Sequence, residues 1–99
     1  MKLQLQNSWR EKDDDRWNWS AYLTGPDVDK VDYVEYVLHP TFVDPVRKVK
    51  AGAQNGFKME TEGWGSFELK AIVHLKNGEN QFLTHEIKLE RGEGRTDVA

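Results

Sequence analysis

Residues 66–89 read SFELKAIVHLKNGENQFLTHEIKL, and this stretch decides the fold class. Its first ten residues place Phe67, Leu69 and Val73 on one parity, which is the period of a half-buried β-strand. A second run, from Phe82, repeats the alternation. Between them, Asn77-Gly78 is the dipeptide that most favours a two-residue type I′ hairpin turn with positive φ at both residues. The stretch predicts an antiparallel β-hairpin.

The chain before this hairpin also reads as short strands. Residues 17–23 alternate, with two tryptophans on the apolar parity. Residues 28–39 are rich in β-branched and aromatic side chains, but Val31 and Val34 lie on opposite parities, which a β-bulge or burial on both faces explains. Shorter extended segments are expected at residues 47–49 and 57–61, and Leu3 and Leu5 suggest one more strand.

Turn residues separate these segments and no segment has helical periodicity, which predicts an all-β antiparallel sandwich of about seven to eight short strands. One domain is expected at residues 1–90. The last nine residues, RGEGRTDVA, are charged and glycine-rich, so residues 91–99 are predicted to be a flexible tail or the start of a linker. The expected core consists of Trp19, Leu23, Tyr36, Leu38, Phe67, Leu69, Val73 and Leu83.

Composition excludes several classes of function. The chain has no cysteine and a formal net charge of −3, so we expect neither thiol chemistry nor a basic nucleic-acid face. No apolar run approaches the ~20 residues of a membrane span, so no direct membrane insertion is expected, and a cytoplasmic location fits the cysteine-free chain. The three histidines lack neighbouring ligands at metal spacing, and we expect no metal and no cofactor.

Catalytic motifs are also missing from the sequence. The serines have no nucleophile-elbow context, and the glycines match neither a phosphate-binding loop nor a dinucleotide fingerprint. The expectation is a binding module without catalytic residues, not an enzyme.

Two motifs point to a binding site on loops. Leu38-His39-Pro40-Thr41-Phe42 stands where a long strand ends, and Gly63-Trp64-Gly65-Ser66-Phe67 stands where a loop enters the strongest strand. Together with two tryptophans at residues 17 and 19 and the Pro-x-Arg-x-Val pattern of residues 45–49, this order resembles the YEATS domain family. The amino-acid sequences of both motifs are similar to those of the bacterial members of the family.

The resemblance implies an immunoglobulin-like sandwich that reads acylated lysine, with a flat acyl-amide held between two loop aromatics. Carried over by motif, Phe42 and Trp64 would be those aromatics, Thr41 would supply a hydroxyl, and His39 would support it. The backbone around Trp64 would supply an N–H donor. Glycines beside it, Gly63 and Gly65, would let a ligand approach closely. The expected partner is an acylated-lysine peptide or another small acyl-amide ligand.

Other interpretations of the same residues remain open. Phe42 has a plain structural alternative, in which its ring simply plugs the end of the sandwich. The alternative function is a protein–protein docking or sensory accessory domain of a larger prokaryotic signalling, membrane or defence protein, with no acyl-lysine binding, in which the two aromatics form an interaction hot spot. Other domains of the parent protein would then be its partners. We expect a monomer, and homotypic assembly through unpaired sheet edges is a third, weaker alternative.

Overall fold

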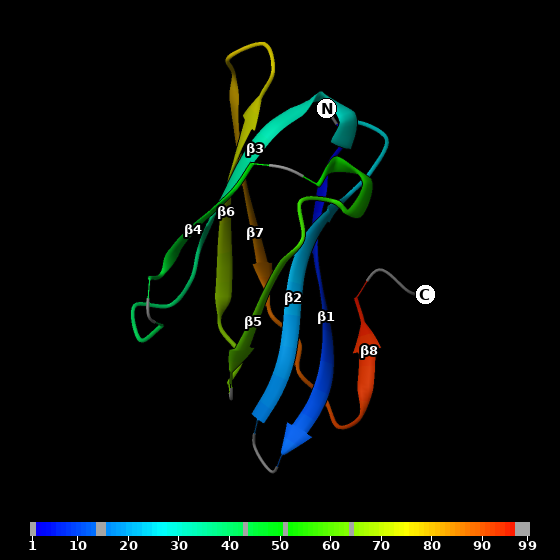
Figure 1. Cartoon of the computed structure of the whole chain (residues 1–99), viewed down its shortest axis with the longest axis vertical. Helices are drawn as coiled ribbons and strands as arrows, with labels where there is room; N and C mark the ends of the chain where they lie inside the picture. The colour runs from blue at the N-terminus through cyan, green and yellow to red at the C-terminus, as the bar shows by residue number, and fades with distance from the viewer. Residues whose placement is uncertain (1, 14–15, 43, 51, 64, 97–99) are drawn as a thin grey trace.

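The computed structural model describes residues 2–13, 16–42, 44–50, 52–63 and 65–96. Within them the chain forms strands and two short 3-10 helices, η1 and η2 (Figure 1). The elements are β1 (Gln4–Asp13), β2 (Arg16–Thr24), η1 (Val28–Lys30), β3 (Val31–Val37), β4 (Val46–Val49), η2 (Ala53–Asn55), β5 (Met59–Gly63), β6 (Glu68–Leu75), β7 (Asn80–Glu86) and β8 (Glu93–Arg95).

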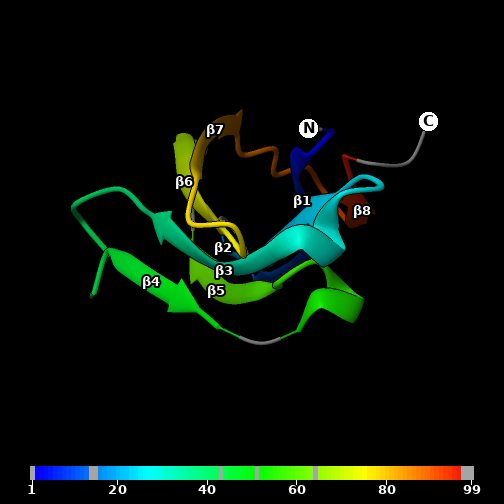
Figure 2. The ribbon, with the colours of Figure 1, turned by 90° about the horizontal axis from the view of Figure 1, so that it is seen from above.

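These strands form two four-stranded antiparallel sheets, in the orders β5-β2-β1-β8 and β4-β3-β6-β7. Seen from above, β4, β3, β6 and β7 follow one another along one layer, and the other sheet lies against it (Figure 2). The prediction of an all-β antiparallel sandwich is confirmed.

The core fills the space between the two inner faces. Six of the eight residues expected there are buried, while Phe67 and Leu83 are partly buried and pack against the core. Tyr36 is fully buried, and its hydroxyl donates a 2.7 Å hydrogen bond to the carbonyl oxygen of Phe57. Burial raises the pKa of Tyr36, so the phenol stays neutral and keeps this donor.

A β-bulge explains the change of parity in β3. The register against β6 shifts between Val31 and Tyr33, so Val31 and Val34 both point into the core although they lie on opposite parities of the sequence. This confirms the bulge that the sequence suggested.

The β6–β7 hairpin is confirmed, but its predicted turn type is wrong. Asn77 does not have positive φ; only Gly78 does, at 90°. Gly78 N–H donates to the Leu75 carbonyl at 3.0 Å, and Leu75 N–H donates to the Glu79 carbonyl at 2.8 Å. This is a three-residue loop with a left-handed glycine at its end. The Asn77 side chain favours it, because its carbonyl oxygen accepts the Glu79 N–H at 2.9 Å.

We expect Gly78→Val to lower the free energy of unfolding by about 1–3 kcal/mol, because a β-branched residue resists a positive φ. A Cβ at Gly78 would meet nothing within 4 Å, so the loss would come from backbone strain alone. Urea unfolding measures it, with Lys76→Val in the same loop as the control. Equal stability of the two variants would contradict the turn assignment.

The C-terminal segment differs from its prediction as a flexible tail. Residues 93–95 form β8, which pairs with β1 at Ser8, Trp9 and Arg10. Gly94 lies opposite Trp9, and a Cβ at Gly94 would lie 2.5 Å from the indole ring, so this glycine permits the packing. The sequence missed this strand because its residues are charged or glycine and are held by backbone pairing. Residues 97–99 lie outside the described part of the chain.

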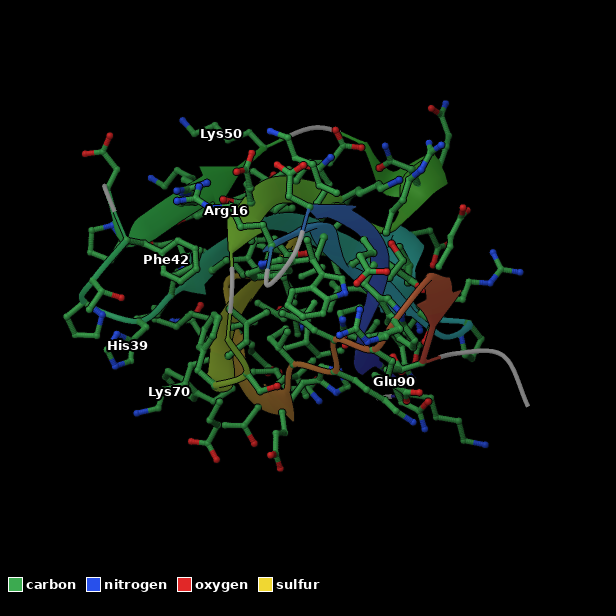
Figure 3. All side chains as sticks on the ribbon, turned by 90° about the horizontal axis from the view of Figure 1, so that it is seen from below. Arg16, His39, Phe42, Lys50, Lys70 and Glu90 are labelled. Atoms are coloured by element: carbon green, nitrogen blue, oxygen red, sulfur yellow. The ribbon has the colours of Figure 1, made fainter. Side chains whose placement is uncertain are left out.

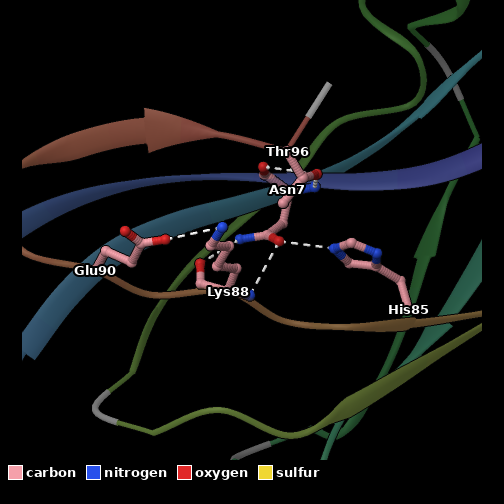
Figure 4. A network of polar contacts seen from close by, with 5 residues as sticks. All are labelled: Asn7, His85, Lys88, Glu90 and Thr96. Atoms are coloured by element: carbon pink, nitrogen blue, oxygen red, sulfur yellow. Dashed lines mark hydrogen bonds and ion pairs between the residues drawn. The ribbon is translucent and has the colours of Figure 1, made fainter. Parts of the chain in front are cut away.

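A buried asparagine ties this segment to the sandwich (Figure 4). Asn7 is 0% exposed, and its side-chain nitrogen donates to the Lys88 carbonyl at 2.8 Å. Its side-chain oxygen accepts from the Lys88 N–H at 3.1 Å and from His85 Nε2 at 2.7 Å. Its backbone N–H donates to the Thr96 hydroxyl at 3.0 Å, and its carbonyl accepts the Thr96 N–H at 2.9 Å. Asn7 joins β1, the β7–β8 connection and the end of β8.

His85 makes this network sensitive to pH. Burial lowers the pKa of His85 below its ordinary value, and the nearby Glu86 carboxylate only partly opposes this. The folded state binds the proton less readily than the unfolded state does. The stabilisation is therefore complete above the ordinary histidine pKa of about 6.5 and is lost as the pH falls below it. We expect urea unfolding to show a drop in stability from pH 7 to pH 5 that is smaller in His85→Gln. Equal drops would contradict this.

Candidate functional site

The first site loop follows β3 and is fixed at both ends. Leu38 is buried, and its N–H donates to the Pro45 carbonyl at 2.7 Å, which closes residues 38–45 into a loop. Inside it, the Phe42 N–H donates to the His39 carbonyl at 3.0 Å, so residues 39–42 form a turn. The anchored Leu38 and this turn hold His39 and Thr41 exposed at one end of the sandwich.

His39 and Thr41 form a polar pair within that turn. The Thr41 N–H donates to His39 Nδ1 at 3.2 Å, and the Thr41 hydroxyl oxygen lies 2.9 Å from the same nitrogen. Because Nδ1 accepts the backbone N–H, it carries no proton here, and the hydroxyl is the donor in the second contact. Both lone pairs of the Thr41 oxygen are then available to accept a hydrogen bond from another group.

Phe42 is half-buried and belongs to an aromatic cluster. Its ring centroid lies 6.2 Å from that of Trp19, edge to face, and 5.4 Å from that of Phe67. His39 completes the group, 6.3 Å from Phe67. Figure 3 shows Phe42 and His39 on the same loop at this end of the molecule. The ring is thus held by packing while part of it remains accessible.

The second loop meets the first at Gly63, the last residue of β5. A Cβ at Gly63 would lie 3.4 Å from Cζ of Phe42 and 3.0 Å from Nε1 of Trp19. A side chain at Gly63 would push against both rings, so glycine there permits the close packing of the two loops. Gly65 differs, because a Cβ there would meet nothing within 4 Å.

The structure therefore brings together four of the six predicted site residues, which are His39, Thr41, Phe42 and Gly63. Gly65 lies two residues farther along the second loop. Trp64 lies outside the described residues, so the facing pair of aromatics stays a prediction.

Sequence reasoning missed two members of this cluster. Phe67 was expected in the core and not among the site residues, yet its ring lies 6.3 Å from that of His39 and 5.4 Å from that of Phe42. Its place in the Gly-Trp-Gly-x-Phe motif was the available signal. Trp19 was likewise assigned to the core; its indole N–H is buried beside Gly63 and has no hydrogen-bond partner among the described residues.

Charges beside the second loop are compensated. Glu62, next to Gly63, accepts hydrogen bonds from Lys12 at 3.0 Å and Arg16 at 3.1 Å. These bonds, with Lys12 the larger contributor, hold the pKa of Glu62 below its usual value. Arg47 reaches across from β4 and donates to the Thr61 hydroxyl at 3.0 Å. The site is thus an aromatic and polar surface without a dominant charge.

Other kinds of site find little support in the described residues. They contain no group of three or more His, Asp or Glu side chains that could hold a metal ion. None of their helices is long and apolar enough to cross a membrane. A broad hollow lies on the sheet of β5, β2, β1 and β8. Its lining includes Ser8 and Ser20, whose hydroxyl oxygens lie 2.5 Å apart, and it extends to Trp19 and Glu62 beside the second loop.

Comparison with known proteins shows which family the chain resembles. The model of the prokaryotic YEATS domain family matches residues 17–88, which include both site loops. The chain is 41% identical over 59 residues to transcription initiation factor TFIID subunit 14 of Schizosaccharomyces pombe, covering 58% of this chain and 23% of that protein. It is 28% identical over 67 residues to the protein AF-9 homolog of Saccharomyces cerevisiae, covering 64% of this chain and 28% of that protein. The chain thus spans about a quarter of the length of either relative.

Proposed function

The chain belongs to the prokaryotic YEATS domain family, and on that premise we propose that it binds an acylated lysine side chain, or a similar small acyl-amide, between its two site loops. The family match covers the loops and the strands that hold them. The proposal concerns binding and assigns no catalytic step to the domain.

The observation that carries the proposal is the packing of Phe42. This ring is fixed against Gly63, Trp19 and Phe67, yet it stays partly exposed beside the free lone pairs of Thr41. A rigid aromatic face next to a hydrogen-bond acceptor suits a flat amide, because the ring contacts the plane and the acceptor fixes its N–H. Gly63 holds the neighbouring loop close enough to supply the opposite wall.

Each group then has a distinct role. Phe42 and Trp64 would hold the two faces of the acyl-amide, and Thr41 would accept its N–H. The backbone N–H groups at Trp64 and Gly65 would donate to the acyl oxygen. His39 would orient the Thr41 hydroxyl by accepting a hydrogen bond from it at Nδ1. Acylation matters because it removes the lysine charge, and a charged ammonium would lose its water between rings with no carboxylate to replace it.

Thr41→Val tests the hydroxyl with little change in shape. We expect binding of an acetyl-lysine peptide to weaken by about 0.5–1.5 kcal/mol, about two- to twelvefold, which is the usual contribution of one hydrogen bond. Thr41→Ser, which keeps the hydroxyl, should bind within about twofold of the wild type. Isothermal titration calorimetry measures both. A loss of equal size in the two variants would exclude the hydroxyl as the contact.

A three-peptide titration tests the function itself. Acetyl-lysine and crotonyl-lysine peptides should bind with dissociation constants of roughly micromolar to millimolar, since few atoms of a flexible peptide make contact. Crotonyl should bind at least as well as acetyl, because its conjugated plane offers more surface to the rings. Unmodified lysine should bind much more weakly. Equal affinity for all three peptides would favour a docking domain without acyl recognition.

A further inference from the structure

Strand β7 is the longest of the four strands at the edges of the two sheets. It has seven residues, while β5 has five, β4 has four and β8 has three. In Figure 2, β7 ends its sheet on the side away from β4. Such an edge presents unpaired backbone groups that can pair with another strand.

The pattern of hydrogen bonds shows which groups of β7 are unpaired. Leu75 N–H donates to the Glu79 carbonyl, and Ile87 N–H donates to the Phe67 carbonyl, so these pairs face each other across the β6–β7 ladder. Hydrogen-bonded and non-hydrogen-bonded pairs alternate along an antiparallel ladder, so only every second residue of β7 directs its N–H and C=O groups toward β6. The residues between them direct their N–H and C=O groups away from β6, and no hydrogen bond to these groups is found in the described part of the chain. They are Asn80, Phe82, Thr84 and Glu86.

β7 also lacks the features by which edge strands commonly avoid pairing. Its sequence, NQFLTHE, has no proline, lysine or arginine, and its register against β6 shows no bulge. The other edges have such features or are short. β4 follows Pro45 and carries Arg47 and Lys48, and β8 has three residues. β5 carries two exposed or half-exposed glutamates and ends in glycine.

An exposed phenylalanine stands on this edge. Phe82 is 72% exposed and lies opposite the half-buried Ile72 on the outer face of the sheet. A large aromatic side chain is favoured on an inner strand, where the side chains of both neighbouring strands can cover it, and less favoured on an edge strand that faces water. The exposure of Phe82 therefore points to a missing neighbour beyond β7.

We propose that β7 pairs antiparallel with β7 of a second copy of this chain, so that two four-stranded sheets join into one. The sequence alone favoured a monomer, but the edge is self-complementary. In the register that overlaps all seven residues, Leu83 faces its own copy, Phe82 faces Thr84, and Asn80 faces Glu86. The outward backbone groups then face each other, and no two like charges are opposed.

The same register brings the two Phe82 rings together. They stand diagonally across the two-fold axis on the outer face, a spacing that aromatic side chains can span. The ladder runs from the hairpin loop toward the end that carries Phe67, so the antiparallel dimer places its two candidate sites at opposite ends. The affinity of each chain for an acyl-peptide should then be unaffected by dimerisation. An experiment can therefore contradict the pairing through β7 without contradicting the proposed binding of an acyl-amide, and the reverse.

Sedimentation equilibrium over a concentration series tests the pairing. The wild-type mass should rise toward that of two chains. Phe82→Lys should weaken association roughly tenfold or more, because the aromatic contact is replaced by two nearby positive charges. Thr84→Pro should abolish it, because the N–H that it removes points outward and is not used by β6. Val46→Lys is the matched control: Val46 is 54% exposed on the opposite edge of the same sheet and should leave the mass unchanged.

Two results would overturn the proposal, namely a single-chain mass at every concentration, or a dimer that neither variant weakens. Phe82→Lys decides if Thr84→Pro does not fold, since the exposed Phe82 side chain adds little to the core. The register has its own test. Leu83 and its copy would form a non-hydrogen-bonded pair, and in such a pair the two α-protons lie close together. A sample mixed from differently labelled chains should show a contact between the Leu83 α-protons of the two copies, and intermolecular contacts confined to other strands would contradict the pairing.

Discussion

Asn7→Ala should lower the free energy of unfolding by about 3 kcal/mol, because it removes three hydrogen bonds made by a fully buried side chain. The substitution removes the acceptor of the Lys88 N–H and of His85, and the donor to the Lys88 carbonyl. Asn7 itself is fully buried, and its hydrogen bonds to Lys88 and His85 are partly buried. Urea unfolding at neutral pH measures the change.

Asn18→Ala is the matched control, because Asn18 lies on the adjacent strand β2 but is exposed. It should change stability by no more than about 0.5 kcal/mol, as is usual for surface substitutions. Amide hydrogen exchange adds a local readout. In Asn7→Ala the Thr96 amide, which donates to the Asn7 carbonyl, should exchange faster. A loss below about 1 kcal/mol would mean that the network contributes little beyond its backbone bonds.

Phe42→Ala should weaken binding of a crotonyl-lysine peptide by about 2 kcal/mol, near thirtyfold, as loss of a central aromatic contact does. Of the two aromatic side chains proposed to hold the acyl-amide, Phe42 is the one that the structure describes. Alanine at this position removes the whole face of the ring. Because Phe42 is half-buried against Trp19 and Phe67, some loss of stability accompanies the substitution. Affinity should therefore be measured at a temperature where circular dichroism shows the variant folded.

Phe42→Leu and Phe82→Ala separate the causes. Leucine keeps much of the packing volume but not the aromatic face, so it should restore stability more than affinity. Phe82 is the exposed phenylalanine on β7, and its removal should leave peptide affinity unchanged. If Phe42→Ala bound peptide as well as the wild type, Phe42 would be a structural plug at the end of the sandwich.

The fold could be predicted from the sequence because apolar and polar residues alternate along several of its strands. The runs in β2, β3 and β6 each bury one face, so their pattern reflects the core directly. β1 was only hinted at, because its inner face includes Asn7, a polar residue that is buried through its hydrogen bonds. β8 was missed because backbone pairing holds it with almost no apolar content. The hairpin turn was misassigned because Asn-Gly is compatible with more than one loop length.

The candidate site was predicted in part for a similar reason. The two motifs locate the loops, and the neighbouring glycine and aromatic residues indicate their packing. No local pattern shows that Phe67 reaches His39, or that the Trp19 indole N–H lies beside Gly63, because these contacts join residues distant in the chain. Likewise, the free edge of β7 follows from strand order, which alternation within single strands does not reveal.

Chemical-shift mapping shows whether an acyl-amide binds between the loops of residues 39–42 and 63–67, as proposed above. A ¹⁵N-labelled domain is titrated with a crotonyl-lysine peptide and, in parallel, with the same peptide unmodified. We expect the crotonyl peptide to shift the amide signals of Thr41, Phe42, Gly63 and Gly65 and the indole signal of Trp19, while the unmodified peptide leaves them nearly unchanged. Shifts confined to other surfaces, or equal shifts with both peptides, would contradict the proposed binding.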